Sequence, residues 1–217
     1  MYRGLVTTPG LRERKKEQTR AAIAEAALRL FADRGFDAVT VAEVAEAANV
    51  STATVFNYFP TKEDLLYSRF EAFEEELLAA VRDRPVGESV LDAFGRFIIE
   101  RSRSGANRDL GARVRTTARI ISDSRALLER ERQIVARYAD ALAELIADET
   151  GAKPDDLRPR VAAGALMAVH RALIDSARRR ARSGRGLSRL AADLEAEGER
   201  ALALLREGLG GYAVKRR

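Results

Sequence analysis

The chain has 217 residues, 46% hydrophobic and 33% charged, with a formal net charge of +5 and no cysteine. The lack of cysteine excludes disulfides and thiolate metal sites, and a single histidine is too few for an imidazole zinc site, so we expect neither metal nor cofactor. No apolar segment approaches the roughly 20 residues of a membrane span, so a cytoplasmic protein without membrane contact is expected. Ala, Leu, Glu and Arg dominate and sheet-type alternation is absent, which predicts an all-α fold.

The first twenty residues carry six cationic side chains against two acidic ones, a net charge of +4. We expect the chain to begin as a flexible basic arm over residues 1–18. A helix is predicted from about Arg12, because Ile23, Ala27 and Phe31 recur on one of its faces. It is expected to end at Gly35, since glycine readily adopts the left-handed conformation that closes many helices.

Hydroxyl side chains mark three helix starts in the following segment, because each can accept a hydrogen bond from an unpaired backbone N–H. Thr40 precedes Glu43, and Thr61 precedes Asp64, at the spacing of a capping box. Ser51 marks the third start without an acidic partner. Together these signals predict three helices in close succession.

The first two of these helices are very short, at Val41–Ala48 and Thr52–Phe59. Helices of about eight residues are unstable alone, so tertiary contacts must hold them. Asn49 lies between them and tolerates left-handed backbone, which predicts a tight turn. Two short helices joined in this way are typical of a helix-turn-helix.

The second short helix has an apolar side, with Val55 and Phe59, and a side suited to DNA. The positions expected to face the bases are Thr52, Ala53, Phe56 and Asn57. The Phe56 ring suits a thymine methyl group, and Asn57 suits an adenine edge. Groups at helix ends are candidates to bind phosphates, at Thr40, Ser51, Thr54, Tyr58 and Lys62. Because this helix is uncharged, the basic arm and Lys62 are expected to supply much of the electrostatic affinity.

The remainder of the chain is expected to form a helical bundle. A long helix is predicted over residues 62–82, and Pro85 and Gly87 then interrupt the helical pattern. Further helices are predicted over residues 88–103, 108–121, 124–149, 154–182 and 187–209. The last two are rich in small residues, which allow close approach, so we expect them to pack against their copies in a homodimer.

Apolar residues on these helices are candidates to surround a small-molecule pocket, with two arginines suited to an acidic group. The candidate effector site comprises Phe94, Phe97, Ile98, Arg115, Arg119, Ile120, Tyr138, Leu142, Met167 and His170. Each apolar residue is also explained as ordinary core, and His170 as a hydrogen-bonded core or interface imidazole. Residues 178–185 carry five arginines, interpreted most simply as a solvated loop; an acidic effector or a second DNA contact is the alternative.

The stretch Gly35–Leu66, GFDAVTVAEVAEAANVSTATVFNYFPTKEDLL, closely resembles the DNA-binding signature of TetR-type regulators. The resemblance implies a three-helix reader, a long connecting helix, a C-terminal domain for ligand binding and dimerisation, and repression relieved by a small molecule. It also implies that the residues named above as phosphate-binding contact phosphates and that those named as base-facing contact bases. Asn49 departs from the commoner glycine and keeps the turn chemistry, whereas Phe56 replaces a commoner tyrosine and removes a hydroxyl.

The sequence therefore predicts a homodimeric repressor that binds a palindromic operator in double-stranded DNA. The expected divisions are 19–66 for the reader, 67–211 for the effector and dimerisation domain, and 212–217 for a tail. An enzyme is disfavoured, because no glycine-rich phosphate loop or paired-acid site is evident. A structural three-helix unit, an adaptor that uses its helices only to dimerise, and an activator are the alternatives that remain.

Overall fold

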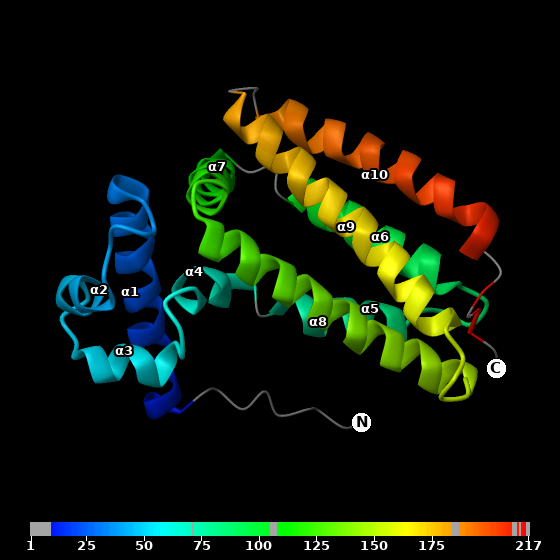
Figure 1. Cartoon of the computed structure of the whole chain (residues 1–217), viewed down its shortest axis with the longest axis horizontal. Coiled ribbons are helices and arrows are strands. Elements are labelled where there is room, and N and C mark those ends of the chain that lie inside the picture. The colour runs from blue at the N-terminus through cyan, green and yellow to red at the C-terminus, as the bar shows by residue number, and fades with distance from the viewer. Residues whose placement is uncertain are drawn as a thin grey trace, which may run out of the picture. The chain divides into compact units, whose positions relative to one another are not determined.

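The computed structural model of the chain describes residues 10–70, 72–104, 108–183, 187–209, 212, 214 and 215. Those residues form helices and no strand, which confirms the expected all-α class (Figure 1). The elements are α1 Leu11–Arg34, α2 Val41–Ala47, α3 Thr52–Tyr58, α4 Asp64–Tyr67, the 3₁₀ helix η1 Ser68–Phe70, α5 Ala72–Arg82, α6 Val90–Ser104, α7 Arg108–Ser122, α8 Arg125–Thr150, α9 Arg158–Arg182 and α10 Leu187–Leu209. No helix among the described residues is long and apolar enough to span a bilayer.

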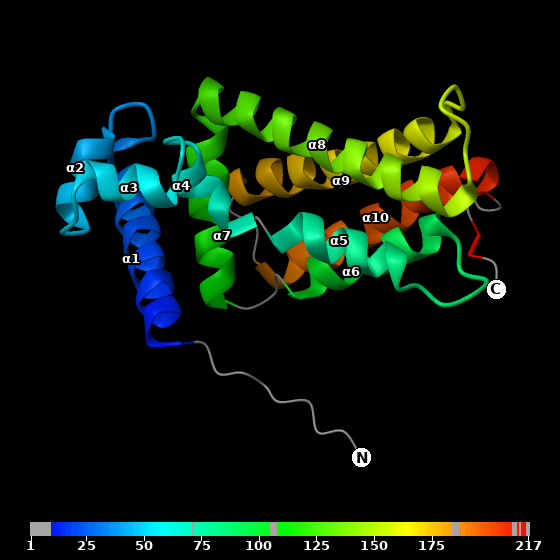
Figure 2. The ribbon, with the colours of Figure 1, turned by 90° about the horizontal axis from the view of Figure 1, so that it is seen from below.

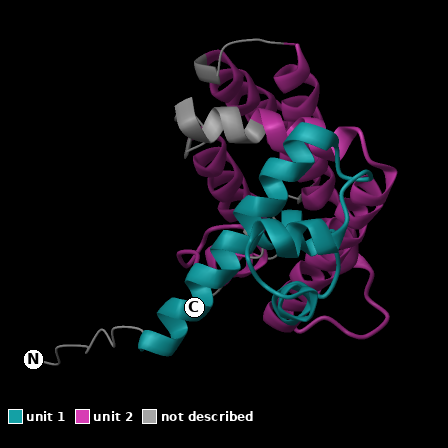
Figure 3. Cartoon of the chain, turned by 90° about the vertical axis from the view of Figure 1, so that its left-hand side faces the viewer, with its two compact units in different colours: residues 1–68 teal, residues 69–217 magenta. Residues whose placement is uncertain are grey.

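The chain divides into two compact units, the first ending at Ser68 and the second starting at Arg69 (Figure 3). In unit 1, α1 contacts both α2 and α4, and α2 contacts α3. The apolar side chains of their shared core include Ile23, Phe31, Val44, Val55, Phe59, Leu65 and Leu66. Burial of these side chains stabilises helices that are too short to persist alone.

The single long helix expected over residues 62–82 is wrong. The chain instead forms the one-turn helix α4, then η1, and then α5. At the interruption, the Phe70 carbonyl accepts a hydrogen bond from the Tyr138 hydroxyl at 3.3 Å. Leu66 on one side of the interruption and Phe73 on the other lie buried in different units. The sequence pattern did not indicate that the residues before and after the interruption pack into the cores of different units.

Unit 2 is a bundle in which α9 is central, with contacts to α8, α7 and α10. The long helices α8 and α9 run side by side in both views (Figures 1 and 2). On the other side of the bundle α10 packs closely on α6, because glycine lies at the crossing. A Cβ atom at Gly198 would lie 2.9 Å from Ile99 Cδ1, and one at Gly95 would lie 3.0 Å from Leu202 Cδ1.

The arginines of residues 178–182 belong to α9, so the solvated-loop interpretation is wrong for them. Arg178 donates to both carboxylate oxygens of Glu131 on α8, at 2.5 and 2.7 Å. Arg180 pairs with Asp193 and Glu197 on α10. These ion pairs join α9 to its two neighbours. Arg185 lies outside the described residues.

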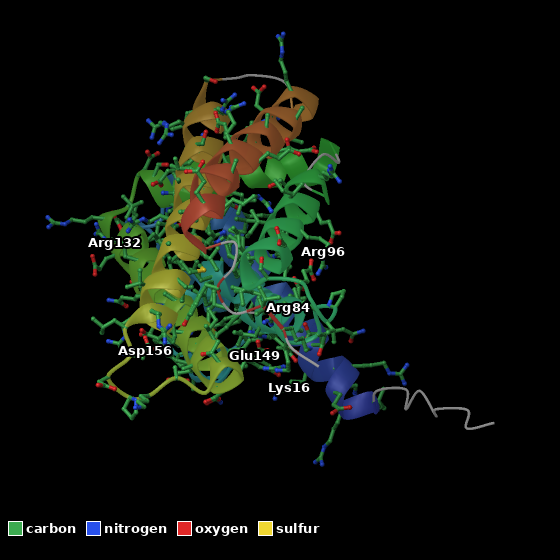
Figure 4. The ribbon with its side chains drawn as sticks, turned by 90° about the vertical axis from the view of Figure 1, so that its right-hand side faces the viewer. Lys16, Arg84, Arg96, Arg132, Glu149 and Asp156 are labelled. Carbon is green, nitrogen blue, oxygen red and sulfur yellow. The ribbon has the colours of Figure 1, made fainter. Side chains whose placement is uncertain are left out.

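Arg84 is a buried cation that joins three segments at one end of unit 2 (Figure 4). Its side chain is 1% exposed and pairs with Glu149 of α8 at 2.7 Å. It also donates to the carbonyl of Val81 at 2.6 Å, which lies in the last turn of α5, and to that of Glu88 at 3.1 Å. Its charge and its donors therefore have partners despite burial, as a buried arginine requires.

We expect Arg84→Gln to lower the free energy of unfolding by about 3 kcal/mol, because the change removes a buried charge and leaves Glu149 without its partner. The matched control is Arg96→Gln, whose side chain is 44% exposed in its pair with Glu88, and which should cost at most about 1 kcal/mol. Urea unfolding of the two variants checks this difference. Equal losses would contradict the structural role assigned to Arg84.

Candidate nucleic-acid interface

The start of α2 is fixed by a reciprocal pair of hydrogen bonds between Thr40 and Glu43. The Thr40 backbone N–H donates to Glu43 Oε2 at 2.7 Å, and the Glu43 N–H donates to the Thr40 hydroxyl at 3.3 Å. Arg34, at the end of α1, donates to Glu43 Oε1 at 2.7 Å. The hydrogen bonds from Thr40, followed by the one from Arg34, lower the pKa of Glu43 to about 2. The expected capping box is confirmed, and it also connects α2 to α1.

The turn between α2 and α3 is closed by backbone hydrogen bonds around Asn49. Among the described residues, Asn49 is the one non-glycine with positive φ, at 53°. Val50 N–H donates to the Ala45 carbonyl at 2.9 Å, and Asn49 N–H donates to that of Glu46 at 3.0 Å. This pattern is a Schellman motif, which satisfies the last carbonyls of α2. The predicted left-handed turn is confirmed.

Helix α3 is oriented by one cap and two buried side chains. The Ser51 hydroxyl accepts from the Thr54 N–H at 3.0 Å and lies 2.8 Å from the Thr54 hydroxyl. Val55 and Phe59 are each 1% exposed. The four positions expected to face bases are exposed, at Thr52, Ala53, Phe56 and Asn57. The predicted division of the two faces is confirmed, and the base contacts stay a prediction.

The polar groups of Lys62 and Thr40, like those of Ser51 and Thr54, already have partners in unit 1. The Lys62 ammonium donates to the Phe36 carbonyl at 2.6 Å and lies 4.2 Å from the centre of the Phe36 ring. Burial lowers the pKa of Lys62. The Thr40 hydroxyl donates to Glu43 at 2.8 Å. The Thr40 hydroxyl has one hydrogen, so it must exchange its carboxylate acceptor to donate to a phosphate. The Lys62 ammonium has three donors and uses one of them for the Phe36 carbonyl. Tyr58 is half-buried at the end of α3.

In unit 2, the Phe73 ring lies beside three other aromatic rings, and each of the four comes from a different helix. Its ring centre lies 4.5 Å from that of His170, 5.2 Å from that of Tyr138 and 5.4 Å from that of Phe97. The Arg101 guanidinium lies 5.1 Å from the centre of the Phe73 ring. Burial, and secondarily the charge of Arg101, lowers the pKa of His170 to about 4. The imidazole is therefore neutral at physiological pH.

This aromatic cluster unites three of the candidate effector residues, namely Phe97, Tyr138 and His170. The candidates buried in the core of unit 2 are Phe94, Ile98, Ile120, Leu142 and Met167. Arg115 and Arg119 are exposed on α7. Phe73 and Arg101 were not singled out from the sequence. Phe73 begins an apolar stripe with Leu77 and Val81, which predicts burial and not a ring cluster.

The chain resembles known proteins over both units. A sequence profile described as "Bacterial regulatory proteins, tetR family" matches residues 23–68, and one described as "MftR C-terminal domain" matches residues 88–210. The HTH-type transcriptional regulator TcmR of Streptomyces glaucescens is 34% identical over 168 residues, which cover 75% of this chain and 74% of TcmR.

Two solved structures share the fold. NalD, the secondary repressor of the MexAB-OprM multidrug efflux pump in Pseudomonas aeruginosa, is 22% identical with a TM-score of 0.56; the match covers 87% of this chain and 97% of NalD. SmeT in complex with triclosan is 20% identical with a TM-score of 0.57, and the match covers 88% of this chain and 90% of SmeT.

The neutral imidazole of His170 predicts a specific pH dependence of stability. Its folded pKa of about 4 lies below the ordinary value of 6.5, so the unfolded chain binds more protons between these values. The free energy of unfolding should therefore rise with pH from 4 to 6.5, by up to about 3 kcal/mol from this group. His170→Gln should remove that part of the rise in urea titrations. An identical pH profile in both proteins would contradict the assignment.

Proposed function

The chain belongs to the TetR family of bacterial transcriptional regulators, which are not enzymes, and we propose that it is a homodimeric repressor released from a palindromic operator by a small hydrophobic effector. The proposed reader comprises residues 19–66 and the proposed effector and dimerisation domain residues 67–211, followed by a short tail. Of the flexible basic arm expected over residues 1–18, residues 11–18 instead form the first turns of α1. We place its action in the cytoplasm, because the DNA that a bacterial regulator binds is there.

The observation that carries the proposal is the composition of the solvent face of α3. Phe56 is 47% exposed between polar and small neighbours, although an aromatic ring is more stable when buried. Its ring suits a thymine methyl group, and the Asn57 amide suits the two hydrogen-bonding atoms of an adenine edge. Thr52 and Ala53 are small enough to let the start of α3 approach the base edges.

Phosphate contacts would position α3 in the major groove. Ser51, Thr54 and Tyr58 are three of the proposed phosphate contacts. Thr40 and Lys62 remain proposed contacts. Thr40 can donate to a phosphate only if the phosphate replaces Glu43 as its acceptor, whereas Lys62 has further donors beside the one bound to the Phe36 carbonyl. Thr40 would then contribute less affinity than a freely accessible hydroxyl, because its internal hydrogen bond is lost on binding.

The exposed faces of α9 and α10 support a homodimer. On α9 the exposed positions include Val161, which is 63% exposed, Gly164 and Ala168, and on α10 Leu204 is 82% exposed. Apolar and small side chains in such a row suit close packing against a second copy. A two-fold dimer would present two α3 helices to half-sites centred about 34 to 36 Å apart, or a multiple of that distance.

The aromatic cluster around Phe73 is the proposed effector site. Aromatic rings and a neutral imidazole suit a flat, largely apolar molecule with one hydrogen-bonding group. The SmeT structure shows that a protein of this fold holds triclosan. We retain Arg115 and Arg119 as proposed partners for an acidic group of the effector. NalD is described as a repressor, which supports repression as the mode of action here.

The double variant Phe56→Ala/Asn57→Ala tests the reader. We expect its affinity for an operator selected from random duplexes to fall at least about 30-fold, because each lost base contact costs about 1 to 3 kcal/mol. The matched control is Val86→Ala/Gln133→Ala, which truncates exposed side chains of the same kinds in unit 2 and should bind as the wild type does. Fluorescence anisotropy measures both. Wild-type affinity in the reader variant would rule out this face of α3.

The double variant Val161→Glu/Ala168→Glu tests the dimer. Two carboxylates on the exposed face of α9 should separate the subunits at micromolar concentration, because each copy would bring like charges to the same interface. Sedimentation velocity should show a dimer for the wild type and for the control Val86→Glu, which alters another exposed apolar residue. A dimer that persists in the α9 variant would place the interface elsewhere.

A further inference from the structure

The aromatic cluster around Phe73 keeps part of its surface accessible. Phe73 and Tyr138 are buried, whereas Phe97 on α6 and His170 on α9 are half-buried. Arg101 follows Phe97 by four residues, so both side chains lie on the same face of α6. The Phe73 ring centre lies 5.4 Å from that of Phe97 and 5.1 Å from the Arg101 guanidinium. The accessible part of the cluster therefore combines an apolar ring, an imidazole and a cation.

The imidazole of His170 has hydrogen-bonding atoms that the chain does not use. Its ring is stacked on Phe73, with 4.5 Å between the ring centres. Within the part of the chain that the structure describes, neither of its nitrogens has a hydrogen-bond partner. A neutral imidazole carries one N–H donor and one acceptor nitrogen. His170 can therefore form a hydrogen bond with a ligand that lies beside the Phe73 ring.

Two ion pairs border the cluster, and each includes an acid of α5, the helix that contacts both α6 and α8 (Figure 2). Arg101 donates to Glu76 at 2.6 Å, and their side chains are 40% and 49% exposed. Arg137, which lies 5.5 Å from the centre of the Tyr138 ring, pairs with Glu74 at 2.9 Å. Exposed ion pairs contribute little to stability. An anionic group of a ligand can therefore replace Glu76 on Arg101 at small cost.

The charge that acts on the imidazole is positive. Burial, and secondarily the charge of Arg101, lowers the pKa of His170, and no carboxylate among the described residues opposes that effect. Glu76 is the more exposed member of its pair with Arg101. A ligand beside His170 would therefore meet the guanidinium of Arg101, whose planar donors suit a carboxylate and repel a cation.

We propose that the effector of this chain is an apolar, ring-containing acid, whose rings pack into the accessible part of the cluster and whose anionic group binds Arg101 in place of Glu76. This inference rests on the proposed function, because it names the chemical class of the effector bound at the cluster. Arg101 differs from Arg115 and Arg119, the other proposed partners of an acidic group, because its guanidinium already lies against a ring of the cluster.

Two fluorescent probes that differ in one charged group test this inference. Anilinonaphthalene sulfonate is a ring-containing anion, and phenylnaphthylamine has the same rings without the sulfonate. Dissociation constants of both probes are measured by fluorescence titration of the full chain. Arg101→Gln removes the proposed anion partner. The matched control is Arg96→Gln, because Arg96 lies on the same helix, pairs with Glu88 and is similarly exposed.

We expect Arg101→Gln to weaken binding of the sulfonate probe about 10-fold and that of the uncharged probe by less than about 2-fold, because only the sulfonate loses a charge-assisted hydrogen bond. Glu76→Gln should strengthen binding of the sulfonate probe about 3-fold, because the competing carboxylate is gone. Arg96→Gln should bind both probes as the wild type does.

Phe97→Ala shows whether the probes occupy the cluster. It should weaken both probes about 10-fold, because both lose the same apolar contact. Equal effects of Arg101→Gln on the two probes, or no effect on the sulfonate probe, would overturn this inference and leave an uncharged effector at the same cluster. Unchanged binding of both probes to the Phe97 variant, or no binding of either to the wild type, would contradict the proposed effector site itself.

Discussion

The reader depends on holding two seven-residue helices that cannot form alone in water. Thr40, Glu43 and Arg34 fix the start of α2 to the end of α1. Asn49 then closes α2 and aims the chain into α3, whose Val55 and Phe59 are buried. With its backbone fixed in this way, α3 keeps Phe56 and Asn57 in solvent, where they are available to a base edge.

Unit 2 meets a different constraint, because it buries polar groups within a helical bundle. Arg84, Arg178 and Arg180 each reach a carboxylate on a neighbouring helix, which offsets the cost of removing a charge from water. His170 avoids the cost of removing a charge from water, because its imidazole, stacked on the Phe73 ring, stays neutral. The two units therefore differ in chemistry: unit 1 exposes Phe56 and Asn57 on α3, and unit 2 packs aromatic rings around Phe73.

Features set by neighbours in the sequence were predictable, and features set by distant contacts were not. The caps at Thr40 and Ser51, the left-handed Asn49 and the two faces of α3 follow from local spacing and were confirmed. The interruption between α4 and α5 was missed, since it involves a hydrogen bond from Tyr138, 68 positions away. The internal partner of Lys62 and the ring contacts of Phe73 were missed for the same reason.

The central claim is that two copies of the chain read a palindrome, each through α3. A hydroxyl-radical footprint on a selected operator tests it most directly, because the footprint reports which backbone positions the bound protein covers. A two-fold dimer should protect two symmetric tracts centred about 34 to 36 Å apart, or a multiple of that distance, on the duplex. A single protected tract, or uniform protection that follows the length of the fragment, would contradict it.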